Sequence, residues 1–136
     1  MPKGNRGGKN GETTGFYKTV DSFEDAQIIV PTERGSNSLP RISNSPDRIY
    51  ILKTPSGEYK SIGIYGKNRE IIKEFDIGHG HKVKDKTGKV VQWLKRGYAH
   101  THISKGGREN NTRYPTKKEI KRYGKYIKFI GGKIYE

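Results

Sequence analysis

Hydrophobic and polar residues alternate from Arg48 onward, and this alternation is typical of strands with one buried face. Three such stretches are separated by the turn sequences "TPSGE" and "GKNRE", which predicts an antiparallel meander. Two later stretches predict one or two further strands. The five stretches are Arg48–Lys53, Tyr59–Tyr65, Ile71–Ile77, Lys89–Leu94 and Gly97–Ile103. The pattern therefore predicts an antiparallel sheet of four or five strands.

Near the C-terminus the period of the apolar residues changes from two to that of a helix. Thr116 and Glu119 have the spacing of a capping box, in which each residue hydrogen-bonds the other's backbone N–H. Gly131 and Gly132 follow as a stop signal. The apolar positions at helical spacing are Ile120, Tyr123, Ile127 and Ile130. We expect an α+β fold in which this helix packs on the sheet.

The first 47 residues lack this organisation. Residues 1–14 are rich in glycine and basic residues and carry no large apolar side chain except Met1, so burial would not offset the entropy of ordering them. Residues 22–30 form one short element of ambiguous type, and residues 31–47 are rich in proline and serine. We therefore expect residues 1–47 to be a flexible basic arm and linker, and residues 48–136 to form the compact domain.

Charge points to a polyanionic partner. The 136 residues carry 28 Lys and Arg against 14 Asp and Glu, a formal net charge of +14. Such an excess is typical of proteins that bind nucleic acid, because phosphate contacts release condensed counterions. Acidic lipid is the rival partner. No apolar run is long enough to span a bilayer and no signal peptide is evident, so we expect a soluble protein acting in the cytoplasm, without a membrane partner.

All four histidines fall into two His-X-His pairs. These are His79 with His81, and His100 with His102. Residues two apart on a strand share a face, and their Cα atoms lie about 6.5 Å apart, so each pair can converge on one small target. If the strand from Ile71 continued through the first pair, those two histidines would face away from Asp76.

Paired imidazoles suit metal-free cleavage of RNA. One imidazole removes the 2′-OH proton while another protonates the leaving 5′ oxygen, and histidine can do both near neutral pH. We expect Asp76 to bias their protonation. Fixed cations would stabilise the charge on the phosphorane, and the candidates in the flanking loops are Lys82, Lys105, Arg108 and Arg113. This chemistry needs no cofactor.

Two other functions remain open. The four histidines could instead bind zinc or manganese in a metal-dependent nuclease, since imidazoles on facing strands can surround one ion. Alternatively, the protein could bind nucleic acid without catalysis, through its basic arm and helix and through stacking on Trp93, Tyr98 and Tyr114.

Residues 61–126 also resemble a known group of domains. The segments "SIGIYGKNREIIKEFDIGHGH", "AHTHI" and "RYPTKKEIKRY" are similar to C-terminal nuclease modules of bacterial polymorphic toxins and phage-borne domains of the Barnase, EndoU, colicin and RelE-like ribonucleases. The resemblance implies a toxin-like ribonuclease with catalytic residues on its sheet, and an acidic immunity or inhibitor protein as a partner. The matching positions are Tyr65, Gly66, Asp76, His79, His81, His100, His102, Arg113, Thr116 and Glu119.

Overall fold

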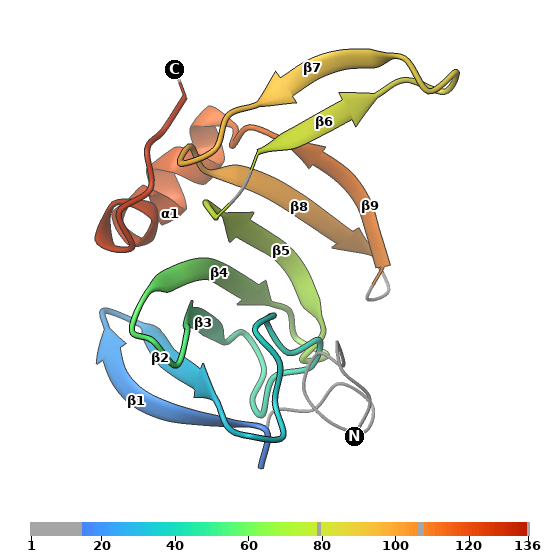
Figure 1. Cartoon of the computed structure of the whole chain (residues 1–136). Coiled ribbons are helices and arrows are strands. Elements are labelled where there is room, and N and C mark those ends of the chain that lie inside the picture. Colours follow the sequence, from blue (N-terminus) through green and yellow to red (C-terminus); the bar gives the residue numbers. More distant parts are fainter. Residues whose placement is uncertain (1–14, 79, 106–107, 136) are drawn as a thin grey trace.

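A computed structural model describes residues 15–78, 80–105 and 108–135, which form nine strands and one helix (Figure 1). The strands in the first half of the chain are β1 (Tyr17–Phe23), β2 (Ala26–Pro31), β3 (Ile49–Lys53), β4 (Tyr59–Tyr65) and β5 (Ile71–Asp76). Those in the second half are β6 (His81–Lys84), β7 (Val90–Leu94), β8 (His100–Lys105) and β9 (Arg108–Arg113), and they precede the helix α1 (Lys117–Phe129).

Seven strands form one sheet in the order β1-β2-β3-β4-β5-β8-β9. All neighbours are antiparallel except β2 and β3, which run parallel. The α+β class, the mainly antiparallel sheet and the C-terminal helix are confirmed, but the expected four or five strands are too few. The predicted strand at Lys89–Leu94 pairs with β6 in a separate two-stranded sheet, whereas β1, β2 and β9 join the main one.

Residues 17–31, expected to belong to the arm and linker, therefore supply two strands to the same sheet as the rest of the chain, whereas residues 1–14 of that arm lie outside the described residues. Ile28 and Ile29 are both buried because β2 lies between β1 and β3, with one side chain on each face. The parallel pairing of β2 with β3 requires a crossover, and residues 32–48 provide it. Leu39 in this crossover is fully buried against the sheet.

The two faces of the sheet bury different cores. α1 covers one face, as Figure 1 shows, and the crossover loop covers part of the other. The helix-side core consists of Ala26, Ile28, Ile51, Ile62, Ile64, Phe75, Ala99, Tyr123, Tyr126, Ile127 and Ile130. The core on the other face consists of Tyr17, Ile29, Leu39, Tyr50, Leu52, Tyr65 and Ile71.

An ion network fixes the start of α1 to the sheet. Thr116 and Glu119 form the predicted capping box. The buried Glu119 carboxylate accepts two hydrogen bonds from the Arg113 guanidinium, at 2.6 and 3.0 Å, and lies 2.7 Å from the Lys73 ammonium. Burial raises the pKa of Glu119, but the hydrogen bonds from Arg113, Lys73 and the Thr116 backbone outweigh it and lower the pKa to about 2.

Among the described residues, no helix has the length and apolar character needed to cross a bilayer.

This network predicts an acid-sensitive contribution to stability. Because the pKa of Glu119 is lowered from 4.5 to about 2 on folding, its stabilisation is complete above pH 4.5 and is lost as the pH falls towards 2. A shift of this size corresponds to about 3 kcal/mol. We expect Glu119→Gln to be less stable than wild type at pH 7, and the difference to shrink towards pH 2. Urea unfolding followed by circular dichroism at several pH values measures it, and a pH-independent difference would contradict the account.

Candidate active site

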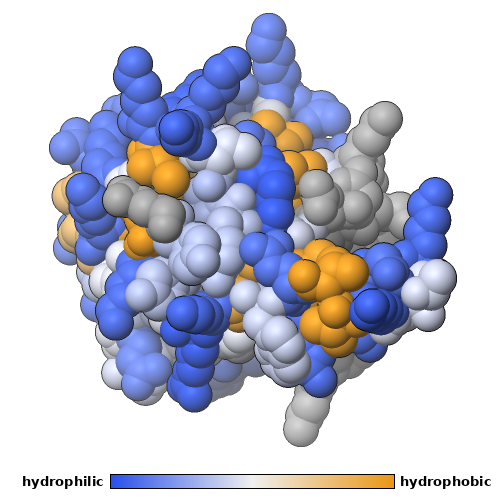
Figure 2. Space-filling view, turned by 90° about the horizontal axis from the view of Figure 1, so that it is seen from above, coloured by the Kyte–Doolittle hydropathy of each residue, from blue (hydrophilic) through white to orange (hydrophobic). Residues whose placement is uncertain are grey.

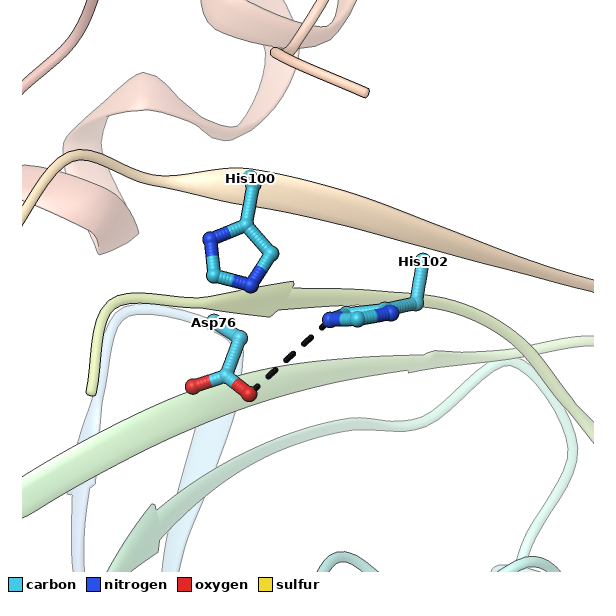
Figure 3. A group of neighbouring side chains, drawn as sticks. All are labelled: Asp76, His100 and His102. Atoms are coloured by element: carbon cyan, nitrogen blue, oxygen red, sulfur yellow. Dashed lines mark ion pairs between the residues drawn. The ribbon is translucent and has the colours of Figure 1, made fainter. Parts of the chain in front are cut away.

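The pairing of β5 with β8 brings an acid and two histidines onto one face of the sheet. Asp76 lies directly opposite His100, and Glu74 lies opposite His102. Side chains at directly opposed positions point to the same face, so Asp76, His100 and His102 all lie on the face away from α1. Figure 3 shows the three side chains pointing toward one another from the two strands.

Three contacts orient the group, and one of them comes from a backbone N–H. The Asp76 carboxylate accepts a hydrogen bond from the Gly78 backbone N–H through Oδ1, at 3.2 Å. Its Oδ2 lies 3.9 Å from His102 Nε2, too far for a direct hydrogen bond but close enough for an electrostatic interaction. The Thr112 hydroxyl lies 3.2 Å from His102 Nδ1, so that ring is contacted at both nitrogens.

The two imidazoles are close but differ in exposure. Their ring centroids lie 4.9 Å apart, with the planes at 68°. His100 is fully buried, with 0% of its surface exposed, whereas 12% of the His102 side chain is exposed. A ligand arriving from solvent therefore reaches His102 first, and His100 lies behind it.

The other histidine pair is placed differently from the expectation. β5 ends at Asp76, so no single strand continues through the pair, and His81 opens β6 in the separate sheet, where it pairs with Leu94. His79 lies outside the described residues, and the side chain of His81 is not among those described. The structure thus brings together the second His-X-His pair and Asp76.

Two of the four predicted phosphate-binding cations have other contacts. Lys82 lies over the Trp93 ring, with its ammonium 4.7 Å from the ring centroid. Arg113 is bound to Glu119 on the helix side, opposite the face that carries the imidazoles. The other two, Lys105 and Arg108, pair through their backbones at the ends of β8 and β9, and their side chains are outside the described part.

Sequence reasoning missed two polar residues on this face. Glu74 lies across from His102, and Thr112 contacts the His102 ring. Both positions follow from strand register, which the sequence does not display. The parity of β5 alone could have placed Glu74 beside Asp76.

The cluster has donors for either of two chemistries. A carboxylate beside two imidazoles can carry protons to and from a substrate. The same donor set also suits zinc or manganese. One ligand atom from each of Asp76, His100 and His102 lies within 4.8 Å of the other two. Metal bonds of about 2.0–2.2 Å would require these atoms to move closer together.

Comparisons with known proteins leave the function to be argued from these residues. No protein-family model matches the chain, and no curated protein or solved structure matches it. The resemblance to the toxin ribonucleases therefore stays a prediction.

The difference in exposure predicts that the two clustered histidines have unequal structural roles. Replacing the fully buried His100 with alanine leaves a cavity, and we expect the free energy of unfolding to fall by about 2–4 kcal/mol. His102→Ala, at a partly exposed position, should lower it by less than about 1 kcal/mol. Chemical denaturation of both variants measures this. Equal losses would contradict the burial of His100.

Proposed function

We propose that this protein cleaves RNA by metal-independent transphosphorylation, with His102 as the general base. The observation that carries the proposal is the convergence of His102, His100 and Asp76 on one sheet face of a chain with a net charge of +14. The positive field attracts the polyanionic substrate, and the imidazoles supply proton transfer at neutral pH.

The reaction uses the substrate's own nucleophile. His102 accepts the proton of the 2′-OH while the 2′ oxygen bonds to phosphorus. The bond from phosphorus to the 5′ oxygen then breaks, and that oxygen takes a proton from a second imidazole. The products are a 2′,3′-cyclic phosphate and a free 5′-OH. On the sequence argument alone, we assign the second imidazole to the His79–His81 pair.

The surroundings of His102 support its role as a base. After it accepts a proton, the imidazolium would face the Asp76 carboxylate, whose Oδ2 lies 3.9 Å from Nε2, and opposite charges at this distance attract each other. His100 packs against the His102 ring and is a positioning residue. Lys105 and Arg108 are proposed to balance the charge on the phosphorane.

The proposal includes the toxin-like context implied by the resemblance. A strongly basic ribonuclease would be attracted to an acidic immunity or inhibitor protein, which would mask its positive surface.

The proposed chemistry predicts RNA cleavage without metal ions. In EDTA, purified protein should cut a single-stranded RNA but leave the 2′-deoxy oligonucleotide of the same sequence intact, because the deoxy strand lacks the nucleophile. His102→Ala should reduce the rate by about 10²–10⁴-fold. Lys128→Ala, on the exposed side of α1, serves as a control and should retain the wild-type rate. Intact RNA with wild-type protein under these conditions would sink the proposal.

A metal-dependent nuclease is the second candidate, favoured by Asp76 joining the two histidines. This set differs from the four-histidine set of the sequence, and it supplies the negative charge that a dication prefers. At this site zinc or manganese would act as a Lewis acid or activate water.

Chelation separates the two candidates. If His102 acts as a general base without a metal ion, exhaustive chelation leaves cleavage unchanged, and added Zn²⁺ inhibits cleavage by occupying the same donors. That is the outcome we expect. Loss of cleavage on chelation, followed by recovery with Zn²⁺ or Mn²⁺, would replace the metal-free mechanism with the metal-dependent one.

A further inference from the structure

The β6–β7 hairpin is a two-stranded ribbon that extends beyond the main sheet (Figure 1). Its turn is held by Asp85, whose Oδ1 accepts hydrogen bonds from the backbone N–H groups of Thr87 at 2.8 Å and Lys89 at 3.1 Å. Gly88 in this turn has a φ of 87°, which favours glycine. The side-chain and backbone hydrogen bonds from Thr87 lower the pKa of Asp85, so its carboxylate is ionised within the turn at neutral pH.

The hairpin exposes large apolar side chains that belong to neither hydrophobic core. Val91 is 59% exposed and Trp93 is 62% exposed, and both lie in β7 two positions apart. Trp93 pairs with Lys82 across the ribbon, and the Lys82 ammonium lies over its ring. A tryptophan exposed to this extent is typical of a binding surface, because its apolar area is otherwise left in water.

The charge of the ribbon selects the class of partner. Residues 81–96 contain six cations and one acid. The acid is Asp85, which is engaged within the turn. The cations are Lys82, Lys84, Lys86, Lys89, Lys95 and Arg96. Figure 2, which looks down on the end of the molecule that carries the hairpin, shows hydrophilic side chains over most of that face with small apolar patches between them.

Aromatic rings continue from the base of the hairpin. The Tyr114 hydroxyl accepts a hydrogen bond from the Lys95 backbone N–H at 3.0 Å. Its ring stacks on Tyr135, with centroids 4.3 Å apart and planes at 6°, and Tyr135 also contacts Tyr98. The Lys133 ammonium lies 5.8 Å from the Tyr98 ring centroid. A row of three tyrosine rings thus continues from the base of the ribbon into the body of the protein, with the Lys133 ammonium over the Tyr98 ring.

The ribbon is attached beside the candidate active site. The backbone N–H of Gly97, three residues after β7, donates to the carbonyl of Ile77 at 3.2 Å. Ile77 directly follows Asp76, and His100 lies three residues after Gly97. The base of the hairpin therefore lies next to the end of β5 that carries Asp76.

We propose that the β6–β7 hairpin binds single-stranded RNA, with an unpaired base stacked on Trp93 and phosphates bound by the flanking lysines. Stacking requires unpaired bases, and a basic surface with interleaved aromatic rings is how proteins bind single strands without reading their sequence. The inference deepens the proposed function by defining its substrate as single-stranded, and it rests on that function in taking RNA as the ligand.

The test uses the fluorescence of Trp93, the single tryptophan of the chain. A 12-residue oligouridylate is titrated into the full-length His102→Ala variant in EDTA, and a labelled oligouridylate gives the affinity by anisotropy. We expect quenching of the tryptophan with the same midpoint as the anisotropy. On the same background, Trp93→Ala should weaken binding about tenfold, while Trp93→Phe should stay within about threefold of the parent.

The controls separate stacking from general damage and from charge alone. Val20→Ala, an exposed apolar residue on the edge strand β1, should leave affinity unchanged. Binding that quenches no fluorescence, or that Trp93→Ala does not weaken, overturns the inference. Quenching by vesicles of acidic phospholipid with none by the oligonucleotide also overturns it, in favour of a membrane surface.

The experiments distinguish a failure of the hairpin inference from a failure of the proposed ribonuclease function. If wild type cleaves RNA but Trp93→Ala has an unchanged KM, the ribonuclease function stands and the hairpin inference falls. If wild type leaves RNA intact while quenching and the tenfold loss are seen, the hairpin inference stands and the protein binds RNA without cutting it.

Discussion

The hydrogen-bonded register between β5 and β8 is the constraint on which the candidate site depends. It places Asp76 opposite His100 and Glu74 opposite His102. A slip of one residue in this pairing would turn the histidines toward the α1 side, into a core built from Phe75 and its neighbours. The apolar residues that hold the register therefore also hold the site.

The two faces of the sheet carry charged groups with different roles: an ion network that supports the fold on one face, and the candidate active site on the other. On the helix side, Glu119 forms ion pairs with Arg113 and Lys73, and these contacts anchor α1 to the sheet. On the opposite side, Asp76 faces two imidazoles, one buried and one accessible. Buried ion pairs stabilise a fold only with good geometry, and the two hydrogen bonds from Arg113 provide it.

Sequence patterns predicted the elements that carry their own local signal. The capping box fixed the start of α1, and apolar alternation located the strands that became β3, β4 and β5. The sequence "RENNTR" of β9 contains no apolar residue, so alternation could not detect it, although backbone pairing with β8 forms it. β1 was missed for a similar reason, since its middle five residues are exposed.

The candidate site was only partly visible in the sequence. The spacing of His100 and His102 placed them on one face, but their approach to Asp76 depends on a register set by two distant strands. Nor did the sequence show the short strand β6, because a loop and a short polar strand look alike in hydropathy. The charge predicts a class of ligand, whereas the proposed place of binding rests on the exposed Trp93, which the sequence could not show.

The central claim is that His102 is the accessible imidazole of the cluster and meets the nucleic acid. Its most direct test is the NMR spectrum of protein labelled on its four histidine rings, recorded while an uncleavable 2′-deoxy oligonucleotide is added. The account predicts a saturable shift of the His102 ring signals. Saturation of binding with the His102 signals unmoved would contradict it.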